Sequence, residues 1–437
     1  MLRRVVLRLL VTVLAVGATG IGGTDGADAA DRFRAGAAVR VITPDPLLPI
    51  SGGMGPAQPA TERRGELTTR ALVVADADTT VAIVGIDLLG FPGVLGDKVR
   101  ALVPRLPPEA LLIGATHTHS APDCYAFPDG KGGHTGDLAW MDEVVRKTAE
   151  AVNEALDTLR PATLRVATDE ARGKIAFNYY APDLYDRRMG VIQALDGDGK
   201  AIGTLVNYAI HPEVLGNKRG ILSPDCIGPM CERIEALGGG VAVFINGAQG
   251  GMVTADNRDL EAIADPIRGY WQDIGTWEEC ERIGHTMADE ALRIVDGAEH
   301  DPAPAVAVHA RDVSFPVESD DLRAVVTLSP LGYAHDKATR TITARLAMVD
   351  VGKARILTIP GEALPNIGAY LKRKTGDDTF LFGLTNDAFG YILSEVDFLA
   401  FPRYQYVSRV SLGERTGTIL VDNLLGMVRE SPRHGTK

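Results

Sequence analysis

Two histidines, His117 and His119, stand two residues apart, after the apolar stretch Ala110–Gly114 and before Pro122. Side chains at positions i and i+2 of an extended segment share one face, so the two imidazoles are expected to point the same way. The apolar stretch predicts a buried strand that ends at this motif. Neutral imidazole is a preferred zinc ligand, and ligands gather at strand ends in α/β sheets. The motif therefore favours a metal site, with exposed or hydrogen-bonded histidines as the alternative.

Other residues that can bind a metal follow three further strand-like runs. Ala201–Ile210 is followed by His211, Lys353–Ile359 by Glu362, and Thr379–Leu384 by Tyr391. Two histidines with one carboxylate form a catalytic zinc set that leaves room for water or substrate, whereas cysteines usually close a structural site. Taken singly, these residues favour structural roles in the core or in turns. The prediction of a metal site depends on the recurrence of a possible ligand after each of these strand-like runs.

The order of the motifs resembles the neutral/alkaline (non-lysosomal) ceramidase family, zinc amidases that cleave the N-acyl bond of ceramide. The resemblance covers nearly the whole mature chain and corresponds to the catalytic domain of that family only. Its most specific motif is Thr116–Ser120. The motifs that carry it are Gly36–Pro44, Thr116–Ser120, His211, Asn246–Thr254, Pro360–Glu362 and the segment from Tyr391 to Tyr406.

The resemblance implies a metal-binding set and one histidine close to it. By this likeness His117, His211, Glu362 and Tyr391 hold Zn²⁺, and His119 faces the water bound by the metal. Zn²⁺ lowers the pKa of bound water to roughly 7 and polarises a carbonyl, so no side-chain nucleophile is required. Hydroxide is then expected to attack the carbonyl, while His119 manages the proton passed to the leaving nitrogen.

The resemblance also implies two catalytic hydroxyls. Thr254 stands where the family has a functional serine, and we expect it to hydrogen-bond the substrate, with a nucleophile or a turn hydroxyl as alternatives. A tyrosine beyond the ligand tyrosine assists catalysis in the family. Tyr404 fits that spacing better than Tyr406, and its hydroxyl is expected to stabilise the oxyanion.

The chain departs from the family around the predicted substrate rather than around the metal. Thr254 replaces the serine, Met252 stands at an aspartate, Tyr179 at an arginine, and Pro212 with Glu213 at Gly-Thr. The expected function is an exported zinc-dependent amidohydrolase that cleaves an N-acyl amide bond, with a ceramide-like lipid as one candidate substrate. The alternatives are a zinc hydrolase of another acyl, ester or lactone substrate, and a non-catalytic secreted binding protein on the same fold.

The amino terminus predicts export. Arg3, Arg4 and Arg8 accompany the mostly apolar run Val5–Val16, and small residues around Ala29 offer a cleavage site. Residues 1–29 are therefore expected to be a signal peptide, too short and too interrupted to be a membrane span. We expect a secreted or periplasmic protein, with no transmembrane segment after the leader.

The charge balance excludes one class of partner. The whole chain carries a formal charge of -12, and loss of a leader with three arginines and two aspartates would make it more acidic. Such acidity argues against nucleic-acid binding and gives no attraction to anionic membranes. A small-molecule or lipid substrate remains, and the sequence assigns no oligomeric state.

Alternating strand-like and helical runs indicate an α/β protein. The clearest predicted helices are Leu138–Leu159, Glu278–Val295 and Leu364–Lys374. We expect a single catalytic domain over residues 30–437, because Glu362 and Tyr391 must return to the histidines. The resemblance implies a two-layer mixed β-sheet core flanked by helices.

Export would allow disulfides between the four cysteines, Cys124, Cys226, Cys231 and Cys280. Cys226 could pair with Cys231, or Cys280 with either of these two, and the sequence does not assign the connectivity.

Overall fold

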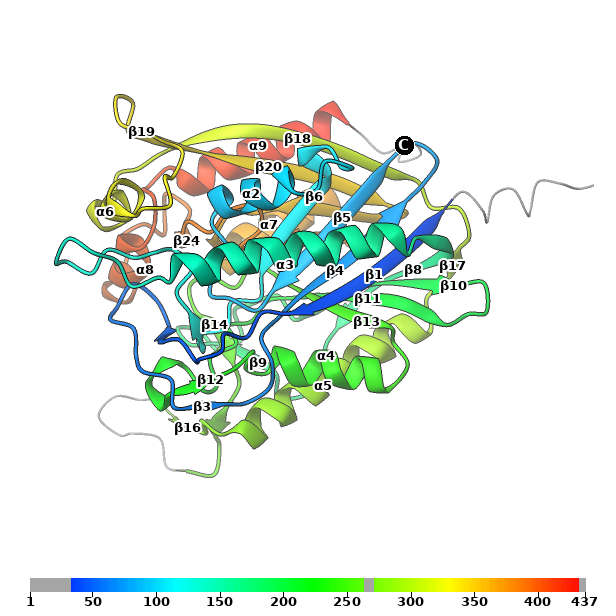
Figure 1. Cartoon of the computed structure of the whole chain (residues 1–437), viewed down its shortest axis with the longest axis horizontal. Helices are drawn as coiled ribbons and strands as arrows, with labels where there is room; N and C mark the ends of the chain where they lie inside the picture. Colours follow the sequence, from blue (N-terminus) through cyan, green and yellow to red (C-terminus); the bar gives the residue numbers. More distant parts are fainter. Residues whose placement is uncertain (1–32, 263–270, 432–437) are drawn as a thin grey trace, which may run out of the picture.

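Two β-sheets face each other in the computed structural model, which describes residues 33–262 and 271–431. The predicted signal peptide lies outside the described residues. The larger sheet has the strand order β13-β11-β10-β8-β1-β4-β5-β6, with β17 paired to β8 (Figure 1). Its strands are β1 (Arg34–Val41), β4 (Thr68–Ala75), β5 (Thr80–Ile86), β6 (Leu111–Ala115), β8 (Arg160–Glu170), β10 (Arg188–Asp196), β11 (Ala201–Tyr208), β13 (Val241–Asn246) and β17 (His300–Asp301).

The smaller sheet has the order β18-β20-β21-β23, with β19 paired to β20. Its strands are β18 (Val306–Pro316), β19 (His335–Asp336), β20 (Thr341–Val351), β21 (Ala354–Thr358) and β23 (Thr379–Phe382). Both sheets are mixed, because β5 runs parallel to β6, β11 to β13, and β21 to β23, while the other neighbours in the two main paths are antiparallel. Apolar side chains from both sheets, including Leu72, Val243 and Phe380, form one core between them.

Helices cover the outer faces of the two sheets. The larger sheet packs against α2 (Gly93–Ala101) and α3 (Leu138–Asp157), and against α4 (Ile227–Ala236) and α5 (Trp277–Asp296). The smaller sheet packs against α7 (Pro365–Thr375) and α9 (Thr416–Glu430). The predicted α/β fold, a two-layer mixed β-sheet core flanked by helices, is confirmed.

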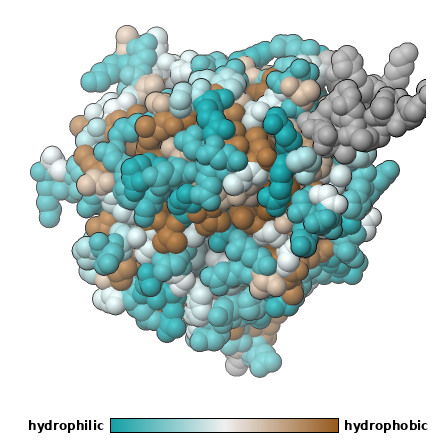
Figure 2. All heavy atoms as spheres, turned by 45° about the vertical axis from the view of Figure 1, so that its right-hand side comes forward, coloured by the Kyte–Doolittle hydropathy of each residue, from teal (hydrophilic) through white to brown (hydrophobic). Residues whose placement is uncertain are grey.

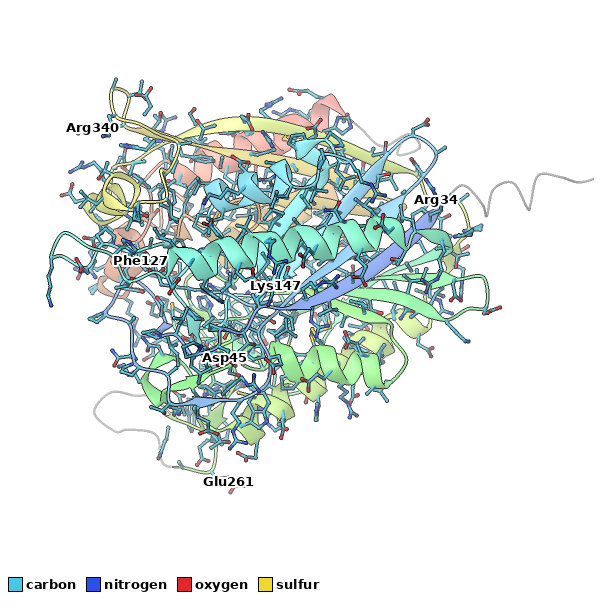
Figure 3. The ribbon with its side chains drawn as sticks, viewed as in Figure 1. Arg34, Asp45, Phe127, Lys147, Glu261 and Arg340 are labelled. Carbon is cyan, nitrogen blue, oxygen red and sulfur yellow. The ribbon has the colours of Figure 1, made fainter. Side chains whose placement is uncertain are left out.

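Helix α3 illustrates how the sequence sets these contacts. The Asp137 side chain caps its first turn by accepting from the Trp140 N–H. One face of the helix is apolar and buried, while Lys147 reaches from its other side to donate to the Val41 carbonyl at 2.7 Å (Figure 3). The helix is thereby fixed over the carboxyl-terminal end of β1.

Polar side chains cover much of the face seen in Figure 2, with apolar side chains visible between them. Within residues 33–262 and 271–431, no helix has the length and apolarity that a membrane crossing requires. All four cysteines are buried free thiols, so the disulfide pairings that the sequence left open do not form.

Candidate metal centre and its cavity

The carboxyl ends of parallel strands carry the predicted metal-binding residues to one place. His117 follows β6, and His211 follows β11. Beyond β21 and β23 the chain forms two short strands, β22 (Glu362–Ala363) and β24 (Tyr391–Ile392). Strand ends of this kind are where α/β proteins commonly bind ligands.

The structure brings the imidazoles and the carboxylate within contact distance of one another. The His117 Nε2 atom lies 3.3 Å from His119 Nε2 and 3.5 Å from Glu362 Oε2. The His211 Nε2 atom lies 3.0 Å from the same carboxylate oxygen. Ligand atoms of the three histidines all lie within 4.8 Å of one another. His119 is thus as close to the cluster as the residues predicted to be ligands.

Backbone carbonyls fix the orientation of two rings. The Nδ1–H of His117 donates to the Leu89 carbonyl at 2.6 Å, and that of His211 donates to the Val253 carbonyl at 2.8 Å. Carbonyl oxygens only accept, so each neutral ring carries its proton at Nδ1, which leaves Nε2, beside Glu362, free to bind a metal. A metal-binding histidine needs this tautomer.

The backbone at His117 differs from the extended segment that the sequence predicted. Its φ angle is +73°, in the left-handed region that a non-glycine residue rarely adopts. The turn is held because the N–H groups of Thr116 and His117 donate to the carbonyls of Ile86 and Leu88. The rings of His117 and His119 still meet, with centroids 4.8 Å apart. Their convergence comes from a strained turn, not from the alternation of a strand.

Glu362 and Tyr391 lie side by side because β22 and β24 pair in parallel with these two residues in register. The Tyr391 hydroxyl donates to the Met252 sulfur at 3.1 Å. Burial, followed by the charge of Glu362, raises the pKa of Tyr391 well above its ordinary value. The phenol therefore stays protonated unless a cation compensates.

The electrostatics of the cluster fit a cation. Burial acts to raise the pKa of the Glu362 carboxyl, but His117 and His211 outweigh it and hold that pKa well below its ordinary value. Burial and the two neighbouring histidines lower the pKa of His119, which keeps it neutral. Ligands of a tetrahedral zinc ion with bonds of 2.0–2.1 Å are about 3.3 Å apart. The contacts of 3.0–3.5 Å in the cluster match that spacing.

The predicted catalytic hydroxyls fall in two different places. Thr254 pairs with His211 in a parallel bridge, and its hydroxyl makes no hydrogen bond in the part of the chain that the structure describes. Tyr406 lines the same cavity as the cluster, with its ring 5.9 Å from that of Tyr391. Tyr404 instead packs its ring against Tyr180 at 5.7 Å. The tyrosine on the cavity wall is therefore not the one that the spacing favoured.

Two polar residues that lie at the metal centre have structural roles there that the sequence did not predict. The Asn246 side chain, at the end of β13, donates to the carbonyls of Ile210 at 2.7 Å and Thr116 at 3.2 Å, so it ties the two histidine loops together. Glu213 lies 3.7 Å from the His119 Nδ1 atom. Asn246 belongs to a motif noted in the sequence, but no local signal reveals its partners.

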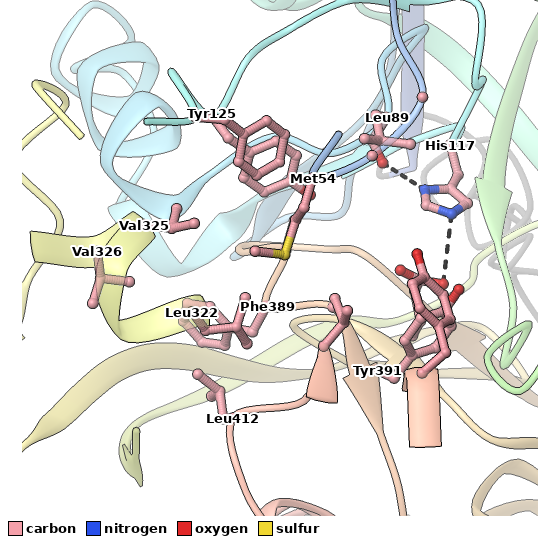
Figure 4. Close-up of a pocket in the computed structure, with 18 of the residues that line it drawn as sticks. Met54, Leu89, His117, Tyr125, Leu322, Val325, Val326, Phe389, Tyr391 and Leu412 are labelled. Carbon is pink, nitrogen blue, oxygen red and sulfur yellow. Dashed lines mark hydrogen bonds and ion pairs between the residues drawn. The ribbon is translucent and has the colours of Figure 1, made fainter. Parts of the chain in front are cut away.

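A cavity opens beside the cluster, with about 700 Å³ of empty space that is partly continuous with solvent. His117, His119, Glu362 and Tyr391 stand at one end. The remaining walls are mostly apolar and come from distant segments, including helix α6 (Asp320–Leu328) (Figure 4). The apolar side chains on those walls include Met54, Leu89, Phe127, Leu322, Val325, Val326, Phe389 and Leu412. The site therefore combines a compact polar centre with room for an apolar chain.

Comparison with solved structures identifies the architecture. The chain matches the neutral ceramidase from Pseudomonas aeruginosa with a TM-score of 0.72 at 16% identity, covering 93% of this chain and 76% of that one. The chain has the neutral ceramidase fold. A ceramidase complexed with C2 matches with the same TM-score at 17% identity, covering 93% of this chain and 77% of that one. At these identities the likeness establishes the fold. No family model matches the sequence, and neither does any curated protein.

Proposed function

We propose that this protein is a zinc-dependent amidohydrolase that cleaves an N-acyl amide bond whose acyl chain lies in the apolar cavity. One observation carries the proposal: His117 and Glu362 line one end of that cavity, and His211 lies against the same Glu362 carboxylate. The neutral ceramidase fold supports it, since a ceramidase acts on an N-acyl lipid. A ceramide-like lipid is accordingly one candidate substrate.

His117, His211 and Glu362 would hold the zinc ion, with Tyr391 beside them. When bound, zinc activates a water molecule and polarises the substrate carbonyl. The Leu89 and Val253 carbonyls keep both imidazoles in the ligand tautomer. The neutral Tyr391 hydroxyl is available as a further ligand or as a hydrogen-bond donor to bound substrate.

Other side chains would handle the proton and the substrate. His119, which its lowered pKa keeps neutral, would accept a proton and deliver it to the leaving nitrogen. A tyrosine hydroxyl at the cavity, Tyr406 or the predicted Tyr404, would donate to the developing oxyanion. Thr254, whose backbone forms a bridge with that of His211, would donate its hydroxyl to the substrate.

The cavity walls would select an apolar acyl group. Burying each methylene contributes about 0.8 kcal/mol, so a chain that fills the space toward α6 gains substantial affinity. A charged group in the same place would lose its hydration without a partner. We further propose that the catalytic domain spans residues 30–437 and that the protein is exported, as the sequence of residues 1–29 indicates.

Metal analysis with substrate profiling tests this function. The purified protein should contain about one zinc per chain by this proposal. It should lose hydrolysis of N-dodecanoyl amides on chelation and regain it when zinc is restored. Hydrolysis of dodecanoyl esters or lactones, with all amides intact, would show that another bond is cleaved. Stoichiometric zinc without hydrolysis of any acyl substrate would indicate a binding protein.

A further inference from the structure

A second pocket lies two strands away from His211. Strand β14 (Val253–Ala255) pairs with β9 (Ala176–Asn178), and the pocket of about 560 Å³ is built over β9. It differs from the apolar cavity because aromatic and charged side chains share its walls. Among them are Phe177, Tyr179, Arg258, Trp271, Asp273 and Arg403.

A row of paired residues connects the metal centre to this pocket. His211 is bridged to Thr254, and Thr254 is paired with Phe177. Directly paired residues project from the same face of a ribbon, and neighbouring strands are about 4.8 Å apart. The pocket therefore begins roughly 10 Å from His211 by that strand spacing. The Thr254 hydroxyl lies midway along the row.

The charged groups of the pocket include both donors and an acceptor. The Arg258 guanidinium lies 4.0 Å from the Phe177 ring centre and is held there by two hydrogen bonds of 2.8 Å to Asp256. The side chains of Arg403 and Asp273 make no hydrogen bond to any residue that the structure describes. Trp271 is 41% exposed, so an aromatic face is available beside these groups.

We propose that this pocket binds a neutral polyhydroxyl head group, such as a hexose, on the part of the substrate opposite the acyl chain. The inference rests on the proposed function, whose substrate it specifies. A sugar satisfies guanidinium donors and a carboxylate acceptor together, and its C–H face packs on aromatic rings. A second hydrocarbon chain would strip water from Arg403 and Asp273. A carboxylate head group would be repelled by the negative charge of Asp273.

Matched substrates test the proposal through activity. The glucoside of N-dodecanoylethanolamine and N-dodecanoylethanolamine itself present the same amide and the same acyl chain. We expect kcat/KM to be at least about tenfold higher for the glucoside, a difference of about 1.4 kcal/mol. The variant Trp271→Ala should bring the ratio close to one. The matched control Tyr370→Ala, at an aromatic residue 36% exposed on α7, should leave the ratio unchanged. Equal kcat/KM values in the wild type would overturn the proposal.

Direct binding separates this inference from the proposed hydrolysis. The glucoside of N-acetylethanolamine, which lacks the long chain, is titrated calorimetrically into the wild type, Trp271→Ala and Tyr370→Ala, with circular dichroism to verify folding. Binding that only Trp271→Ala loses supports the sugar pocket, even if no amide is cleaved and the proposed function fails. No binding, binding that Trp271→Ala retains, or tighter binding of N-acetyl-β-alanine would overturn it.

Discussion

The metal centre and the two pockets beside it are held in the fold by different means. Backbone groups fix the centre: the carbonyls of Leu89 and Val253 orient two histidines, and strand register places Glu362 beside Tyr391. The walls of the pockets are mostly side chains from α6 and from loops and short strands that belong to neither main sheet. A fold built in this way can retain its chemistry while its substrate changes.

The largest effect is expected at the metal centre itself. In His211→Ala, Glu362 loses the imidazole 3.0 Å away and the cluster loses a ligand atom. Even partners of metal ligands change affinity or activity by 10–100-fold, so zinc content should collapse and hydrolysis should fall by more than about 100-fold. Elemental analysis and kinetics measure both. The exposed His285→Ala on α5 is the control, and unchanged zinc content in His211→Ala would exclude His211 as a ligand.

The loop that carries Tyr391 should give the protein a pH-dependent stability. Burial, with a smaller effect of Asp97, raises the pKa of Asp387 from 3.8 to about 7, against hydrogen bonds from the Gly93 and Ala388 N–H groups and the weaker effect of Arg100. The protonated carboxyl therefore stabilises the fold fully below about pH 4, and this contribution is lost as the pH rises to about 7. The total is about 4 kcal/mol.

Urea denaturation at pH 5 and pH 8 measures the part of this loss that falls above pH 5, about 3 kcal/mol. Asp387→Asn should remove most of the difference between the two pH values, because the amide cannot ionise. The exposed Asp142→Asn should keep the wild-type difference. An equal pH dependence in Asp387→Asn and the wild type would contradict the assignment.

Asn246 should matter more for stability than any residue of the pockets. In Asn246→Ala, the buried carbonyls of Ile210 and Thr116 lose their donor, which should lower the free energy of unfolding by about 3 kcal/mol. Zinc affinity should fall with it, because both histidine loops loosen. Asn153→Ala, which removes one hydrogen bond to Leu102 on the surface, should cost less than about 0.5 kcal/mol. Equal losses in the two variants would show that Asn246 has no special role.

Tyr406, which lines the cavity, and Tyr404, which packs on Tyr180, should differ in their effect on catalysis. Tyr406→Phe should lower kcat by about 100-fold, the usual cost of losing one oxyanion donor, with little change in KM. Tyr404→Phe, whose ring packs on Tyr180 outside the cavity lining, should have a much smaller effect. A larger loss of kcat in Tyr404→Phe than in Tyr406→Phe would support Tyr404 as the catalytic tyrosine, as its spacing from Tyr391 in the sequence predicted.

The smallest effect concerns chain length. Val325→Trp fills part of the cavity near α6, so the preference for dodecanoyl over hexanoyl amides should fall about tenfold, from roughly 0.8 kcal/mol per methylene. Leu328→Trp, at a residue 68% exposed on the same helix, should keep the preference. An unchanged preference in Val325→Trp would show that the acyl chain does not bind in this cavity.

The sequence predicted the elements that local periodicity controls. The strand predicted from the stretch Ala110–Gly114 corresponds to β6, and the predicted helices Leu138–Leu159 and Leu364–Lys374 correspond to α3 and α7. Their apolar residues recur with the period of the element and face a core. The chain order of the family-like motifs then sufficed to anticipate the neutral ceramidase fold.

Features that depend on long-range pairing were beyond such reasoning. The alternation argument for His117 and His119 placed the rings together for the wrong reason, since a left-handed residue breaks the strand. The partners of Asn246 lie on loops far apart in the chain. The choice between Tyr404 and Tyr406 depends on how a short helical turn packs, which spacing alone does not encode.

The register of β22 and β24 has a consequence for how this protein can change over time. This pairing holds Glu362 and Tyr391 side by side, so the exposed turn between α7 and β23 can be lengthened without separating the two oxygen donors. A slip of one position in either strand would instead turn the oxygen donor of that strand away from its partner. Insertions there should be tolerated, whereas a single deletion inside either two-residue strand should not.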